Sequence, residues 1–95
     1  MIHHVVMFKF SAPTPALIAE VSALLLGMEG KVPELASIEV GADCVHSERS
    51  CDLLLMTHFK SWDDLDRYRV HPRHKEVLAH LAPLMERSSV VDYET

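Results

Sequence analysis

The sequence predicts an α+β domain of the ferredoxin-like β-α-β-β-α-β order, with helices on one face of a four-stranded antiparallel sheet. Three observations carry this prediction. Four segments have the composition of strands, two segments have helical spacing, and the first strand is apolar on both of its faces. The 95 residues make a single domain over residues 1–95, and so short a chain favours burial of further surface in an oligomer.

The first strand is expected over residues 2–10, IHHVVMFKF, because this segment is rich in β-branched and aromatic residues. Alternation places His4, Val6 and Phe8 on one face of the strand and Met7 on the other. Since both faces are largely apolar, we expect both to be covered. We predict that the face with Val6 and Phe8 turns away from the helices and forms a homodimer interface, in which two sheets close an α/β barrel.

A first helix is expected to begin after Thr14, a natural N-cap, with Pro15 at its first position. Apolar residues recur at helical spacing until Gly27, which marks the end of the helix. Two further strands are expected within ELASIEVGAD and CDLLLMTHFK, and a polar loop around HSERS joins them.

The second helical part is expected to be broken. Ser61 caps its first piece, whose apolar side carries Trp62, Leu65 and Tyr68. Pro72 cannot lie inside a straight helix, so a second piece runs from about Pro72 to residue 81. SSVVDYE then forms a short final strand.

Composition excludes several classes of partner. The formal net charge is −5 and the nine basic residues are dispersed, so we expect no nucleic-acid binding. No apolar run approaches the roughly 20 residues that span a bilayer, so we expect no membrane insertion. The segment MIHHVVMFKF lacks the features of a secretory signal, and we expect a cytoplasmic chain.

The one cluster of potential metal ligands is Cys44, His46 and Cys51. Its spacing matches no standard zinc pattern and a fourth ligand is missing, so we expect two unpaired cysteines in a loop. The remaining histidines are dispersed over several elements. We therefore expect neither a tightly bound metal nor another cofactor.

Three segments, HHVVMFKF, YRVHPRH and VVDYE, resemble the stress-responsive A/B barrel domain family, in order and over nearly the whole chain. The resemblance implies a dimeric α+β barrel. One plant member, olivetolic acid cyclase, closes a linear polyketide by intramolecular aldol condensation without a cofactor. The resemblance implies that its catalytic tyrosine and histidine fall on Tyr68 and His74, a further histidine on His4, and apolar pocket positions on Val6 and Phe8.

The stretch YRVHPRH permits two interpretations. In the first, His71 caps the helix that begins at Pro72 and His74 is a satisfied histidine on an apolar helical face. This interpretation predicts a non-catalytic, stress-associated or small-ligand-binding dimer.

In the second interpretation, His74 is a general base and Tyr68 donates a hydrogen bond to a carbonyl that gains negative charge. His4, His71 and the apolar side chains would contact the substrate, and Asp92 on the last strand would orient the base. This arrangement predicts a cofactor-independent lyase or isomerase that acts on a hydrophobic carbonyl compound such as a polyketide.

Overall fold

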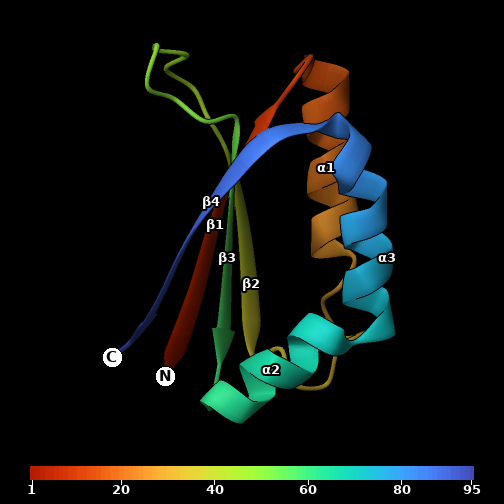
Figure 1. The fold of residues 1–95 in the computed structure, drawn as a ribbon, viewed down its shortest axis with the longest axis vertical. Helices are drawn as coiled ribbons and strands as arrows, with labels where there is room; N and C mark the ends of the chain where they lie inside the picture. The colour runs from red at the N-terminus through yellow and green to blue at the C-terminus, as the bar shows by residue number, and fades with distance from the viewer.

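The computed structural model describes residues 1–95 and places all helices on one face of a four-stranded sheet (Figure 1). The elements are β1 (Ile2–Phe10), α1 (Pro15–Leu26), β2 (Ser37–Ala42), β3 (Leu53–Phe59), α2 (Trp62–Val70), α3 (Pro72–Leu81), a 3₁₀ turn (Ala82–Leu84) and β4 (Met85–Glu94). The strand order is β2-β3-β1-β4 and every neighbouring pair is antiparallel. This arrangement confirms the predicted α+β class and ferredoxin-like order.

The helices begin where the sequence supplies side-chain caps. The Thr14 hydroxyl accepts a hydrogen bond from the Leu17 amide at 3.1 Å. Ser61 caps α2 in the same way, through the Asp64 amide at 3.1 Å. None of the helices is both long enough and apolar enough to cross a membrane.

The break between α2 and α3 lies at His71, whose backbone is extended, with φ −63° and ψ 136°. Its imidazole Nδ1 accepts a hydrogen bond from the Arg73 amide at 3.0 Å and so caps α3. Pro72 occupies the first helical turn, where a missing amide hydrogen costs nothing. Trp62 was expected on the apolar side of α2, but it is the first residue of the helix and is 45% exposed.

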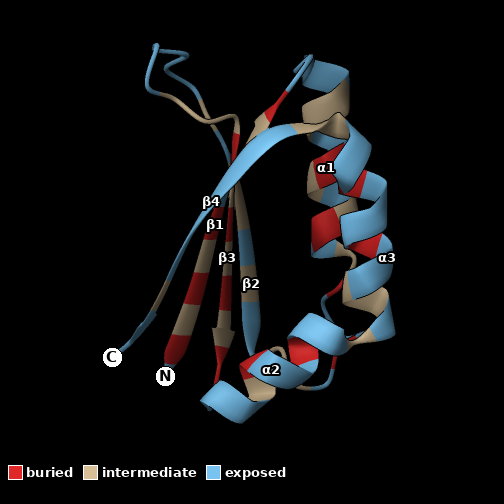
Figure 2. Cartoon of the chain, viewed as in Figure 1, coloured by how far each residue is buried: buried red, intermediate tan, exposed pale blue.

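The core lies between the helices and the sheet, as the buried residues in Figure 2 show. Alternate residues of β1 from Ile2 to Phe10 are buried toward the helices, and Val6 and Phe8 are among them. The prediction that Val6 and Phe8 form a dimer interface is therefore wrong. Alternation identifies which residues share a face, but here both faces are apolar, so composition could not tell which one the helices cover.

The opposite face of the sheet is not covered by any helix of this chain. We call it the open face and define it by Val5, Met7, Leu54, Met56 and Val91. These residues are neighbours, because Val5 pairs with both Met56 and Val91, and Met7 pairs with Leu54. Met7 is 40% exposed and Val91 56% exposed. An apolar sheet face of this kind on so small a domain is typical of an interface.

Candidate functional site

A cavity of about 200 Å³ lies between the sheet and helices α2 and α3. Its lining is mostly apolar and includes Val6 and Phe8, as the resemblance implies for pocket positions. The polar lining residues are His4, Tyr68, Arg69, His74 and Ser88. A largely apolar lining with a few convergent polar groups is typical of a ligand site.

The helix break brings the two residues of the YRVHPRH stretch together. Tyr68 ends the buried side of α2, and His74 lies six positions later in the first turn of α3. On one straight helix their side chains would point in different directions. With the extended residue His71 between the helices, the Tyr68 and His74 rings are 4.2 Å apart, centroid to centroid. The His4 ring approaches Tyr68 from β1, at 6.1 Å.

The Tyr68 hydroxyl has no oxygen or nitrogen partner. The residue is fully buried, with 0% of its surface exposed, and its hydroxyl contacts only the Met28 sulfur at 3.9 Å. A thioether is a weak acceptor, so most of the hydrogen-bonding capacity of the hydroxyl is unused. Burial raises the pKa of Tyr68 far above its ordinary value. The phenol therefore stays protonated near neutral pH and is available as a donor.

His74 has the hydrogen bonding of a neutral base. Its Nδ1 lies 3.1 Å from the backbone carbonyl oxygen of Arg69. A carbonyl only accepts, so Nδ1 carries the proton and Nε2 keeps its lone pair when the ring is neutral. Burial lowers the pKa of His74 below its ordinary value, which favours this neutral form near pH 7.

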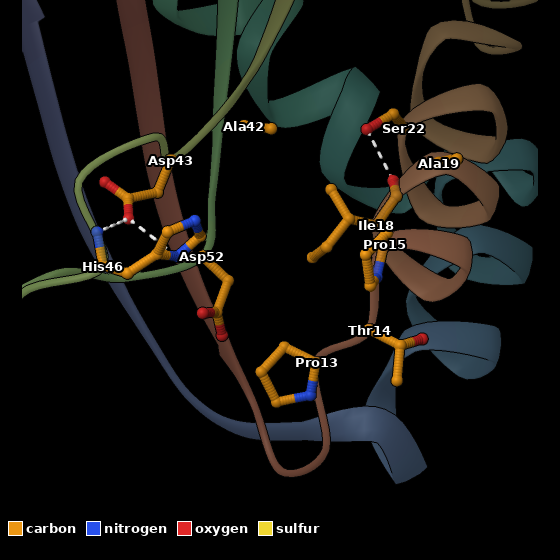
Figure 3. A pocket seen from close by; sticks show the side chains of 10 residues that line it. All are labelled: Pro13, Thr14, Pro15, Ile18, Ala19, Ser22, Ala42, Asp43, His46 and Asp52. Atoms are coloured by element: carbon orange, nitrogen blue, oxygen red, sulfur yellow. Dashed lines mark hydrogen bonds and ion pairs between the residues drawn. The ribbon is translucent and has the colours of Figure 1, made fainter.

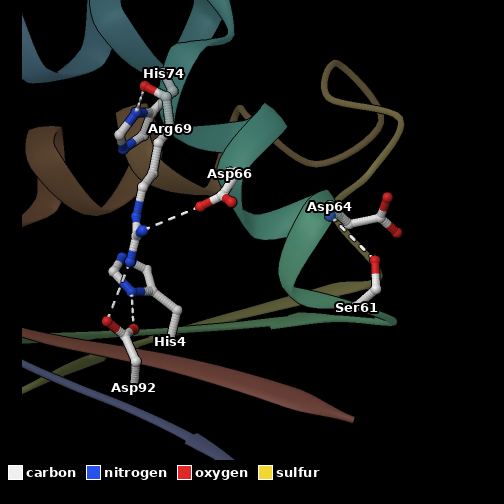
Figure 4. A network of polar contacts seen from close by, with 7 residues as sticks. All are labelled: His4, Ser61, Asp64, Asp66, Arg69, His74 and Asp92. Atoms are coloured by element: carbon white, nitrogen blue, oxygen red, sulfur yellow. Dashed lines mark hydrogen bonds and ion pairs between the residues drawn. The ribbon is translucent and has the colours of Figure 1, made fainter.

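His4 is held by a carboxylate rather than by a carbonyl. Its Nδ1 hydrogen-bonds Asp92 Oδ1, and Asp92 Oδ2 accepts from the Arg69 guanidinium at 3.2 Å (Figure 4). The same guanidinium donates to Asp66 at 3.3 Å. Asp92 was predicted to orient His74, and this is wrong. The sheet register pairs Asp92 directly with His4, and it therefore orients that histidine instead.

Two other assignments need correction. His71 was predicted to contact substrate, but it is not part of the cavity lining, because its ring is turned to the backbone of α3. Arg69 lines the cavity and was not singled out from the sequence. Its spacing from Asp66 is that of an ordinary surface ion pair on a helix, so no local signal pointed to the site.

A larger hollow of about 510 Å³ lies elsewhere, between the start of α1 and the β2–β3 connection (Figure 3). Its carboxylates already have partners within the chain. Asp43 accepts from the His46 amide at 2.7 Å, a bond that lowers the pKa of Asp43, and Asp52 accepts from the Phe10 amide at 2.8 Å. Nowhere in the chain do three or more His, Cys, Asp or Glu side chains gather as a metal site would require.

The fold and the cavity define a small α+β protein with a ferredoxin-like subunit and an imidazole- and phenol-lined chamber under its helices. The chain belongs to the stress responsive A/B barrel domain family, which it matches over residues 2–95. No curated protein matches the chain significantly.

Solved structures share the fold over nearly the full length. A dimeric protein of unknown function with a ferredoxin-like fold from Bacteroides fragilis is 26% identical, with a TM-score of 0.87 and coverage of 99% of this chain and 95% of that chain. A dimeric ferredoxin-like protein from Thermobifida fusca is 25% identical, with a TM-score of 0.87 and coverage of 99% and 90%. The hydroxynitrile lyase of Passiflora edulis is 18% identical, with a TM-score of 0.83 and coverage of 97% and 90%, which shows the fold alone.

Proposed function

We propose that the protein is a homodimeric, cofactor-independent enzyme that moves a proton on a small, hydrophobic carbonyl compound, with lyase or isomerase chemistry. The observation that carries this proposal is the Tyr68 hydroxyl, which is fully buried beside the cavity with only a sulfur contact. A buried donor whose one hydrogen-bond partner is a thioether is only weakly satisfied in the free protein. A carbonyl oxygen in the cavity would satisfy it.

The proposed reaction uses the two neighbouring rings in different roles. His74 Nε2 removes a proton from the carbon next to the substrate carbonyl, and the electron pair of that C–H bond moves to form the enolate. Tyr68 donates its hydrogen bond to the oxygen on which the negative charge develops. The protonated His74 then returns the proton to carbon or to a leaving group, which restores the neutral base.

The size of the cavity restricts the substrate. About 200 Å³ equals the liquid volume of about seven water molecules, and drug-sized ligands need about 300 Å³ or more. We therefore favour a compact aldehyde or ketone over an extended polyketide. The hydroxynitrile lyase with the same fold supports this proposal, because it shows that the architecture is compatible with an enzyme.

We also infer that the open face is the homodimer interface. The similar proteins from Bacteroides fragilis and Thermobifida fusca are described as dimeric. Packing two copies through Val5, Met7, Met56 and Val91 would remove the exposed apolar surface and close an α/β barrel. The cavity lies on the other side of each sheet, so each subunit would carry its own site.

The test measures proton exchange and does not require the natural substrate. Small ketones and aldehydes are incubated with the protein in D₂O, and loss of the α-proton signal is followed by NMR. We expect the protein to accelerate exchange, and His74→Ala to reduce the rate about 10²–10⁴-fold. His80→Ala is the matched control, because His80 is also on α3 but pairs with Glu20 outside the cavity.

Three outcomes separate the alternatives. Exchange that depends on His74 but not on His80 supports the enzyme. Ligand binding without exchange, seen as chemical-shift changes at the cavity, would instead identify a non-catalytic ligand-binding dimer. Neither binding nor exchange across small aldehydes and ketones would leave these residues with a structural role and would refute the proposal.

A further inference from the structure

Arg69 is linked to the Nδ1 atoms of both cavity histidines. It contacts His74 Nδ1 directly and reaches His4 Nδ1 through the carboxylate of Asp92. Its backbone carbonyl accepts from His74 Nδ1 at 3.1 Å. Its guanidinium donates to Asp92 Oδ2 at 3.2 Å, and Asp92 Oδ1 accepts from His4 Nδ1. Figure 4 shows the residue between the two rings, with the histidines on opposite sides of it.

Both contacts have the same consequence for the rings. A carbonyl and a carboxylate are acceptors, so Nδ1 is the protonated nitrogen in His4 and in His74. The nitrogen without a protein partner is then Nε2 in each ring. Which nitrogen of a histidine carries the proton is commonly set by the hydrogen bond that the other nitrogen makes.

We infer that Arg69 is a positioning residue that fixes both imidazoles of the cavity as Nδ1–H tautomers, so that both leave Nε2 free for a ligand. The geometric part of this inference stands on the contacts alone. Its catalytic meaning rests on the proposed function, in which His74 transfers the proton and His4 lines the same cavity.

The guanidinium suits this role better than an ammonium would. It is planar and is held from two sides, by Asp92 and by Asp66 at 3.3 Å. Asp92 therefore has one oxygen on Arg69 and the other on His4, which prevents rotation of the carboxylate. Lysine would present one point charge and would not hold both carboxylates in a fixed plane.

The exposure of Arg69 indicates that its ion pairs do little for global stability. The side chain is 47% exposed, and ion pairs between exposed groups contribute little to folding. Replacing Arg69 should therefore change the site and leave the fold intact. His74 should be affected less than His4, because its partner is the backbone carbonyl, which remains after any substitution.

The experiment compares imidazole tautomers by long-range ¹H–¹⁵N NMR in the wild-type protein and in Arg69→Gln. We expect Nδ1–H signals for both rings in the wild type. In Arg69→Gln, the His4 signals should shift toward a mixture of tautomers, while those of His74 stay unchanged. Arg67→Gln is the matched control, because Arg67 is on the same helix and pairs with Asp64 away from the cavity.

The two proposals fail in different ways. His4 tautomers that are the same in Arg69→Gln and in the wild type would overturn the inference about Arg69, whatever the activity. A tautomer change in a protein that shows no exchange would support Arg69 as the positioning residue and would count against the proposed enzyme.

Discussion

Removal of the Tyr68 hydroxyl should stabilise the protein while it impairs the site. In Tyr68→Phe the ring keeps its packing against Phe59, at 5.0 Å, and only one oxygen atom is lost. A buried polar group without a proper partner costs about 1–3 kcal/mol, and the contact with the Met28 sulfur at 3.9 Å offsets a minor part of this. We expect a net gain in unfolding free energy of about 1 kcal/mol.

Chemical denaturation is the appropriate assay, at one fixed protomer concentration because a dimer's stability depends on concentration. For a domain of this size, about 1 kcal/mol corresponds to a rise in Tm of about 4–8 °C. The same variant should exchange substrate protons more slowly than the wild type, because the enolate oxygen loses its donor. Tyr93→Phe is the control, since Tyr93 is 41% exposed in the single chain and does not line the cavity.

Opposite signs for stability and activity are the specific signature of a donor kept for a ligand. If Tyr68→Phe lowered the unfolding free energy by about 1 kcal/mol or more, the hydroxyl would be satisfied in the free protein and the reasoning would be refuted. Equal changes in Tyr68→Phe and Tyr93→Phe would show that the effect does not come from the cavity.

The remaining predictions concern pH, assembly and the helix break. The pKa of His74 lies below its unfolded value of 6.5, so its contribution to stability should be full above pH 6.5 and lost as the pH falls through the folded pKa. His74→Gln should weaken this dependence of unfolding free energy on acid pH. Proton exchange by the wild type should slow over the same pH range. The same pH dependence in His74→Gln and in the wild type would contradict burial of the His74 ring. Val91→Asp should sediment as a monomer, because it would bury a charge in the proposed interface. Val70→Asp, on the exposed surface of α2, should stay dimeric. A dimeric Val91→Asp would exclude the open face as the dimer interface. His71→Ala should lower the unfolding free energy by about 0.5–2 kcal/mol while proton exchange is retained, because the cap of α3 is lost. His71→Asn should restore most of that stability. Loss of exchange at unchanged stability would show that His71 contacts the substrate.

The fold class, the helix caps and the break between α2 and α3 could be predicted from the sequence, because each depends on local chemistry. Thr14, Ser61 and Pro72 act on the backbone within a few residues of themselves, so short segments are sufficient to predict their effect. Alternation also grouped His4, Val6 and Phe8 correctly on one face. It could not assign that face to the helices, because the direction from which helices cover a sheet is a property of the whole chain.

The polar partners of the site were harder to predict for a related reason. Asp92 faces His4 only because β4 lies next to β1 in one particular register, in a pairing that joins residues 88 positions apart. A shift of that register by one residue would turn Asp92 to the other face of the sheet. Arg69 depends on the same register, since its partner on the sheet is Asp92. Its contact with Asp66 has the spacing of any helical surface pair.

The break at His71 therefore contributes to both the fold and the proposed chemistry. It ends α2 at Val70, one residue after Arg69. The Arg69 carbonyl therefore has no amide of a continuing helix to accept from, and it accepts from His74 instead. It also changes the direction of α3 relative to α2, so that the His74 and Tyr68 ring centroids are 4.2 Å apart. A continuous helix would satisfy the Arg69 carbonyl with its own backbone and would separate the two rings. The donor, the base and the group that sets the tautomer of the base thus depend on one interruption of the helix.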